Sequence, residues 1–324
     1  MSKVLILKVG YNEILEPSPG HTDYVDYGVS LGDVLRCTVL LHAFKDDDVT
    51  WVTAREAFPL LTGNPYVRRL LPYDFTVCMQ LQRELFDVVI NLEKVPGICA
   101  LTDSINAWKK LGFRLNPVTG EAEAYEGAQE AITLSRELSE KRRAPNPLSE
   151  LLFRLIGKRW SGEDYILGYQ PKTDVRFDVG FNHHVGDKWP VKAWAHEHWE
   201  RLASLLTGQG LTVDWQRGLN SLEAYMEWVH SCRAIVTCDS LGAHLALAMH
   251  KPVVILFGPT FAEEVYVGEN CRKVFPTDPP DCVPCMRPTC DQPTRCMDAI
   301  EPERVADEIV EVLGVSRQAA AALA

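Results

Sequence analysis

Residues 237–260, TCDSLGAHLALAMHKPVVILFGPT, bring together side chains that could bind an anion. Asp239 and Ser240 end one hydrophobic run, His244 follows in a helix-like stretch, and the next hydrophobic run ends in Gly-Pro-Thr at 258–260. The backbone N–H groups and the dipole at a helix start favour phosphate. His244 shares a helix face with Ser240. The segment predicts a nucleotide or sugar-phosphate site, and simple N-capping by Asp239 and Ser240 is the structural alternative.

A second group of reactive side chains lies in CVPCMRPTCDQPTRC, residues 282–296, with the spacing C-x2-C-x4-C-x5-C. Five prolines between 279 and 293 disfavour helix and strand here, and a tetrathiolate metal would hold such a segment together. Zinc and iron both accept four sulfurs. Disulfides are the alternative, which a cytosolic protein disfavours. We predict structural iron or zinc, with no catalytic role, at Cys282, Cys285, Cys290 and Cys296.

Composition limits the classes of partner. The chain has 324 residues, enough for two domains, and a formal net charge of −11, which argues against a general affinity for nucleic acid. No apolar stretch is long enough to cross a membrane. The N-terminal MSKVLILKVG lacks a cleavage site and predicts a first strand rather than a signal peptide. A cytoplasmic location is the resulting expectation.

The elements that must position these residues alternate between strand and helix. Apolar strands at 3–9, 48–54 and 86–93 are separated by helical patterns, and residues 96–113 are predicted helical to Gly112. Continuous apolar strands indicate parallel sheets covered on both faces. A linker at 168–174 divides the chain into domains 1–168 and 169–324.

The second domain repeats the alternation. Strands are predicted at the runs VRFDVGFNHH, LTVDW, RAIVTC and PVVILFG, with helices between them and a final helix at 301–313. Two doubly wound, Rossmann-like halves facing a central cleft are the predicted α/β architecture, with ligands beyond the carboxyl ends of the strands.

These motifs together resemble glycosyltransferase family 9, the bacterial heptosyltransferases with a two-domain GT-B fold. Asp-Ser at a strand end, a histidine in the next helical turn and FGPT carry the resemblance. SLGDVL at 30–35 is similar to the family's N-terminal loop, and the segment 186–206 is similar to its K-x-W-P…W/F…L pattern. The four-cysteine segment is similar to the iron-binding finger of autotransporter heptosyltransferases. In GT-B proteins the final helix often crosses back to the first domain.

The resemblance implies an inverting glycosyltransferase. Heptose from ADP-heptose would pass to a hydroxyl of a lipopolysaccharide core or a protein, with Asp33 as general base and Lys188 supporting the leaving diphosphate without a catalytic metal. The donor-binding residues implied are Asn182, His183, Lys188, Glu223, Asp239, Ser240, Leu241, Gly242, His244, Gly258, Pro259 and Thr260.

Two departures from the family bear on the donor and the acceptor. The residues Asn182, His183 and His184 stand where many members have small residues, which changes the expected donor contacts. A long insert at 11–29, with four carboxylates and three tyrosines, precedes Asp33 and is predicted to shape acceptor choice.

Other readings remain open. A GT-B hexosyltransferase, a sugar-nucleotide epimerase and a non-catalytic sugar-nucleotide-binding assembly protein would use the same residues, and turnover of ADP-sugar distinguishes them. The expected partners are a nucleotide-sugar donor and a glycan or protein acceptor, with no nucleic acid. A lipid-linked acceptor would allow peripheral association with the inner membrane, and a homo-oligomer is a further expectation.

Overall fold

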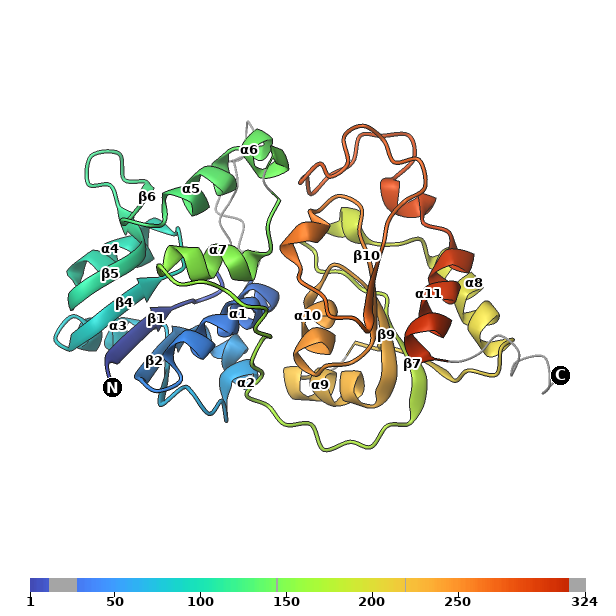
Figure 1. Cartoon of the computed structure of the whole chain (residues 1–324), viewed down its shortest axis with the longest axis horizontal. Helices are drawn as coiled ribbons and strands as arrows, with labels where there is room; N and C mark the ends of the chain where they lie inside the picture. The colour runs from blue at the N-terminus through green and yellow to red at the C-terminus, as the bar shows by residue number, and fades with distance from the viewer. Residues whose placement is uncertain (12–27, 144, 219, 315–324) are drawn as a thin grey trace. The chain divides into compact units, whose positions relative to one another are not determined.

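The computed structural model divides the chain into two compact units, Met1–Tyr169 and Gln170–Ala324, one residue beyond the predicted domain boundary. The structure describes residues 1–11, 28–143, 145–218 and 220–314 (Figure 1). The insert at 11–29 therefore lies mostly outside the described residues, together with its carboxylates Glu13, Glu16, Asp23 and Asp26.

The first unit is built on a sheet in the order β3-β2-β1-β4-β5-β6. Neighbouring strands are parallel except β6, which runs antiparallel to β5. The strand order is that of a Rossmann sheet extended by one antiparallel strand at its edge. Its strands are β1 (Lys3–Leu7), β2 (Asp48–Thr53), β3 (Arg69–Pro72), β4 (Leu85–Asn91), β5 (Asn106–Leu115) and β6 (Ala122–Ala124).

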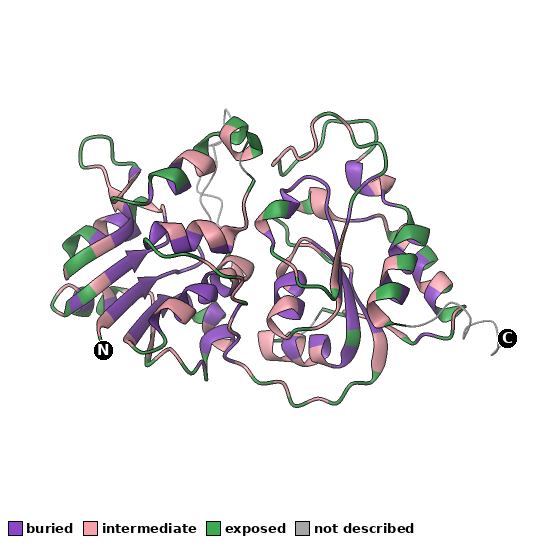
Figure 2. Ribbon diagram, viewed as in Figure 1, coloured by how far each residue is buried: buried purple, intermediate pink, exposed green. Residues whose placement is uncertain are grey.

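The central strands of this sheet carry apolar side chains on both faces and are buried, as the purple strands in Figure 2 show, because helices cover the sheet. α3 and α4 pack their apolar residues against Leu5, Leu7 and Val89, and α1 packs with α7. The helices are α1 (Leu31–Cys37), α2 (Phe58–Leu61), α3 (Phe75–Leu81), α4 (Pro96–Ser104), α5 (Gln129–Arg136), α6 (Leu138–Arg143) and α7 (Leu148–Leu155). Short 3-10 segments, η1 (Thr38–Phe44) and η2 (Arg55–Ala57), precede β2 and α2.

The predicted continuous helix over 96–113 is wrong. The helix α4 ends at Ser104, and the next residues form β5, which pairs in parallel with β4. Pairing with β4 overrides the local helical pattern, because β5 extends the sheet. Gly112 shows how closely the backbones of β5 and β4 approach each other. A Cβ atom on Gly112 would lie 1.8 Å from the carbonyl oxygen of Asn91, and Gly112 has a φ of +88°.

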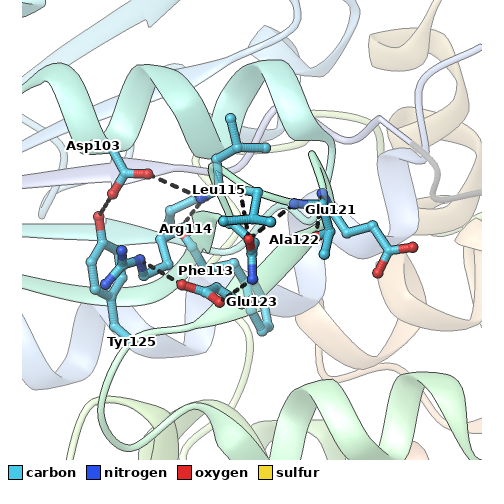
Figure 3. Close-up of polar contacts among 12 residues, drawn as sticks. Asp103, Phe113, Arg114, Leu115, Glu121, Ala122, Glu123 and Tyr125 are labelled. Atoms are coloured by element: carbon cyan, nitrogen blue, oxygen red, sulfur yellow. Dashed lines mark hydrogen bonds and ion pairs between the residues drawn. The ribbon is translucent and has the colours of Figure 1, made fainter.

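Side chains fix the turn from α4 into β5 and β6 (Figure 3). The carboxylate of Asp103 in α4 accepts hydrogen bonds from the Tyr125 hydroxyl and, at 3.0 Å, from the Leu115 amide. Arg114 and Glu123 form an ion pair of 3.0 Å across the two strands. These contacts join residues that the helical pattern would have kept apart, so they stabilise the β5–β6 hairpin.

The second unit contains a parallel sheet in the order β11-β10-β9-β7-β8. This is the flavodoxin-like order, with the two halves of the winding meeting between β7 and β9. The strand β11 was not predicted. The strands are β7 (Phe177–Asn182), β8 (Val213–Trp215), β9 (Cys232–Cys238), β10 (Val253–Leu256) and β11 (Cys271–Val274).

Helices again lie on both faces of the sheet. α8 and α11 share a buried cluster with the sheet through Trp199, Leu202 and Ile309, while α9 and α10 contact each other and β9. The helices are α8 (His196–Thr207), α9 (Leu222–His230), α10 (Leu241–Ala248) and α11 (Pro302–Leu313). Three 3-10 segments complete the unit: η3 (Pro190–Lys192), η4 (Ala262–Glu264) and η5 (Cys296–Ala299).

The final helix packs on α8 and on strands of its own unit. Its predicted return to the first domain stays a prediction, as does the central cleft. Among the described residues, no helix is both long enough and apolar enough to span a bilayer.

Candidate active site

The winding of each sheet reverses at one place, between β1 and β4 in the first unit and between β7 and β9 in the second. Open α/β sheets bind ligands beyond the carboxyl ends of the strands at such a reversal. Most of the predicted site residues follow one of these strand ends or begin the helix after it. Each unit therefore has its own candidate edge.

In the second unit, Asp239 follows β9 and is the centre of a charged cluster. The Lys192 ammonium donates to an Asp239 carboxylate oxygen at 2.9 Å, and the Thr260 hydroxyl donates to the same oxygen at 2.8 Å. The side chains of Lys192 and Asp239 are 15% and 14% exposed, so solvent reaches both charges. This places a cation and a carboxylate beside the start of α10.

Asn182, at the end of β7, connects this cluster to α9. Its amide nitrogen donates to the Thr237 hydroxyl at 2.7 Å and to the Ser240 hydroxyl at 2.9 Å, and its carbonyl accepts from the Tyr225 hydroxyl at 2.6 Å. A Cβ atom on Gly242 would lie 2.5 Å from the Asn182 amide nitrogen. Gly242 therefore lets α10 begin against this network.

The capping alternative for Ser240 is not what the structure shows. Its hydroxyl makes no capping hydrogen bond to α10 and instead contacts Asn182. His244, one turn further on, is 5% exposed. The start of α10, from Leu241 on, is thus positioned by side chains outside the helix, which leaves its dipole directed at the strand edge.

His183 and His184 extend the same edge. Their ring centroids lie 3.9 Å apart, and the His183 ring lies 5.1 Å from that of Trp215 at the end of β8. Burial, with His184 and His196, lowers the pKa of His183. The lowered pKa favours the neutral ring, which would contact a donor through hydrogen bonding rather than charge.

Glu223 lies in the first turn of α9, which Ser221 caps by accepting from the Ala224 amide at 3.1 Å. Within the described part of the chain, the half-buried Glu223 carboxylate has no hydrogen-bond or ion-pair partner. A carboxylate in this state can accept hydrogen bonds from ligand hydroxyls.

The four predicted metal ligands line one small pocket, together with Val191 and Pro259. All ten cysteines of the chain are free, so the disulfide alternative is not observed in these thiols. Burial and the three neighbouring thiols raise the pKa of Cys296 to about 11. No group of three or more His, Cys, Asp or Glu side chains lies at metal-binding separation among the described residues. The donor set fits iron or zinc by its chemistry, and binding would require the thiols to draw together.

The first unit has a second lysine–carboxylate pair at its own edge. Lys8, just after β1, lies 3.1 Å from the Glu93 carboxylate just after β4, and their side chains are 10% and 0% exposed. Glu93 also accepts from the Gly10 amide at 2.6 Å. Burial disfavours the Lys8 ammonium, but Glu93, Cys37 and Asp33 outweigh burial and raise the pKa of Lys8.

Asp33 lies in the first turn of α1, close to this pair. The Ser30 hydroxyl donates to its carboxylate at 2.7 Å, Arg36 lies at 3.6 Å, and its side chain is 42% exposed. A carboxylate has several lone-pair sites on its two oxygens, so an accessible one is chemically suited to accept a substrate proton. Its position after β1 is where a ligand of the first unit would meet it.

Sequence reasoning missed three participants: Lys192, Tyr225 and the Lys8–Glu93 pair. The signal for Lys192 was present, because Lys192-Ala193-Trp194 has the K-x-W spacing, whereas Trp189 follows Lys188 directly. Trp194 is 3% exposed and anchors this segment in the core. Lys188 lies half-buried in the turn before η3. For Lys8 and Glu93, the signal was a charge placed directly after an apolar strand.

Comparison with solved structures identifies the architecture. The E. coli heptosyltransferase WaaC with ADP-2-deoxy-2-fluoro heptose superposes with a TM-score of 0.60 at 19% identity, covering 95% of this chain and 99% of that one. The bacterial iron-containing dodecameric glycosyltransferase TibC from enterotoxigenic E. coli gives a TM-score of 0.58 at 11% identity, covering 97% and 76%. The two α/β units have the GT-B fold of glycosyltransferases.

Sequence matches agree with the resemblance. Residues 218–293 match the model of glycosyltransferase family 9 (heptosyltransferase), the family that the motifs resemble, which confirms the resemblance. Lipopolysaccharide heptosyltransferase 1 of Pseudomonas aeruginosa is 27% identical over 173 residues, 40% of this chain and 46% of the relative. The match spans less than half of that relative's length.

Proposed function

We propose that this chain is an inverting glycosyltransferase that transfers heptose from ADP-heptose to a hydroxyl of a lipopolysaccharide core or a protein. One observation carries the proposal: the family match at 218–293 contains Asp239, Ser240, His244 and the segment Gly258-Pro259-Thr260, which we call the 258–260 wall. In support, Thr260 donates to Asp239 just before the start of α10. The solved relatives bind ADP-2-deoxy-2-fluoro heptose and ADP-D-beta-D-heptose.

The proposed reaction is a single displacement. The acceptor oxygen attacks the anomeric carbon, its proton passes to Asp33, and the electron pair of the breaking carbon–oxygen bond leaves with the nucleoside diphosphate. The Lys192 ammonium and the start of α10 stabilise the charge that develops on the diphosphate. Glu223, half-buried and unpartnered within the described residues, would accept hydrogen bonds from the ribose hydroxyls. We also propose that this transfer needs no catalytic metal.

Lys192 takes the diphosphate role in this proposal. Its ammonium already lies at the edge, held by Asp239 at 2.9 Å and partly exposed. Lys188 remains the alternative drawn from the sequence. Asn182, Gly242 and Tyr225 shape the site, and His183 contributes a neutral hydrogen-bonding ring.

The four cysteines are proposed to hold one structural iron or zinc ion. Their shared pocket and free thiols support this, and the iron-containing TibC has the same fold. Elemental analysis of reductively purified protein should find about one metal equivalent per chain. Metal far below one equivalent, with disulfides detected by mass, would contradict it.

Partners and location follow as proposals. A glycan or protein acceptor, a cytoplasmic location and peripheral contact with the inner membrane through a lipid-linked acceptor agree with the proposed reaction. A homo-oligomer is proposed as well, because the neighbour TibC is described as dodecameric.

A nucleotide screen followed by a transfer assay tests the proposal. ADP should raise the unfolding temperature of the protein more than UDP or GDP, and ADP-heptose should be consumed in the presence of acceptor extract. Preference for UDP with turnover would favour a hexosyltransferase. ADP binding without turnover would favour the non-catalytic alternative, and conversion of the sugar without acceptor would favour an epimerase.

A further inference from the structure

The cysteine segment 282–296, which we call the knuckle, touches both loops that supply partners to Asp239. Its pocket is lined by the four thiols and also by Val191, next to Lys192, and by Pro259, next to Thr260. Lys192 and Thr260 are the two side chains that donate to the Asp239 carboxylate. The knuckle therefore lies directly behind the second unit's charged cluster.

Contact between the knuckle and the 258–260 wall is close. A Cβ atom on Gly258 would lie 2.7 Å from the Cys296 sulfur and 2.7 Å from the Met297 sulfur. Real Cβ atoms do not approach heavy atoms so closely, so an alanine here would force the wall or the two sulfurs to shift. The amide of Met286, inside the knuckle, also donates to the Pro259 carbonyl at 2.8 Å.

The far end of the knuckle is anchored in the core. Met297 is fully buried, Cys296 is 9% exposed, and both belong to the apolar cluster under α8 and α11. The Trp194 indole donates to the Ile300 carbonyl at 3.1 Å, which ties the segment after Lys192 to the residues that follow the knuckle. Any displacement of the knuckle is thus passed to both loops through direct contacts.

We propose that the knuckle is a positioning element for the donor site: its packing against Gly258 and Pro259 sets the place of Thr260 and, through Asp239, of Lys192. This role rests on the proposed function, because it assumes that these side chains receive a nucleoside diphosphate. It assigns the knuckle an effect on nucleotide affinity in addition to local stability.

The test is a pair of glycine variants measured with ADP by calorimetry. Gly258→Ala inserts a methyl group between the wall and the two sulfurs, and we expect ADP affinity to fall about tenfold or more. Gly268→Ala is the matched control, because a Cβ there meets nothing within 4 Å, and its affinity should equal that of the wild type. Circular dichroism and the unfolding temperature establish that each variant is folded.

Amide hydrogen exchange on the wild-type protein gives a readout that needs no variant. ADP should slow amide exchange at Met286, whose amide donates to the Pro259 carbonyl, and also at the start of α10. If Gly258→Ala binds ADP as well as the wild type and Gly268→Ala do, the positioning role is wrong while the proposed function stands. The same conclusion follows if ADP slows amide exchange at the start of α10 but not at Met286. If the wild type binds no nucleotide, both are wrong.

Discussion

The two sheet edges carry the same pair of charges in different surroundings. In the first unit, the side chains of Lys8 and Glu93 are 10% and 0% exposed, and Glu93 also accepts a hydrogen bond from the Gly10 amide. In the second unit, Lys192 and Asp239 are joined at a similar distance but remain partly exposed. The buried pair connects Lys8 to Glu93 inside the first unit, which fits a scaffolding role, whereas the partly exposed pair of the second unit can exchange contacts with an arriving anion.

This difference assigns separate tasks to the two edges. The first holds the Gly10 backbone through Glu93 and leaves Asp33 accessible, and the second would present a cation to the proposed donor. Position at the sheet reversal is shared, but burial decides which charges are available.

The largest expected effect is on the rate of transfer. Asp33→Asn keeps the shape of the side chain and removes the proposed base, so the single-turnover rate should fall about 10²–10⁴-fold with ADP affinity unchanged. A near wild-type rate would place the base elsewhere. The carboxylates Asp23 and Asp26 of the insert would then be the next candidates.

The next effect is on stability. Glu93→Gln leaves Lys8 as an uncompensated buried charge, and the free energy of unfolding should fall by about 3 kcal/mol in urea titrations. Glu123→Gln removes an exposed partner of Arg114, with both side chains more than a third exposed, and should cost under about 1 kcal/mol. Equal losses in the two variants would refute the distinction between buried and exposed pairs.

A smaller effect should appear in acid. Hydrogen bonding from Arg69, with Lys3 assisting, lowers the pKa of Glu84 to about 2 although burial opposes this. Because the folded pKa lies below the unfolded value, this stabilisation is present above about pH 4.5 and is lost as the pH falls toward 2. Glu84→Gln should therefore cost about 1–2 kcal/mol at pH 7 and almost nothing at pH 2, in unfolding experiments across that range. A constant difference would contradict the linkage.

The sequence predicted the fold well because apolar strands and helix spacing are local signals. The segment 237–260 folded as the strand end, helix and strand that its pattern indicates. Residues 106–113 did not, because pairing with β4 is a long-range contact that no local pattern encodes. The same limit applies to β11, a four-residue edge strand without strong periodicity.

The sequence was sufficient to predict which motifs contribute to the candidate site, but not all of the contacts within it. Asp239, Ser240 and Thr260 were found because they end hydrophobic runs, and the structure brings Thr260 to Asp239. Choosing Lys192 over Lys188 required knowing which ammonium reaches Asp239, since both are followed by tryptophan within two residues. The contact of the knuckle with Gly258 joins residues nearly forty positions apart and has no local signal.

The most direct test of the account is an ADP titration by calorimetry of four proteins: wild type, Lys192→Ala, Lys188→Ala and Glu93→Gln. The account predicts one site per chain, an affinity lowered about 10- to 100-fold in Lys192→Ala through loss of charge-assisted hydrogen bonds, and affinities near wild type in the other two. Unchanged affinity in Lys192→Ala, or an equal loss in Glu93→Gln with the fold intact, would contradict the assignment of the donor to the exposed pair of the second unit.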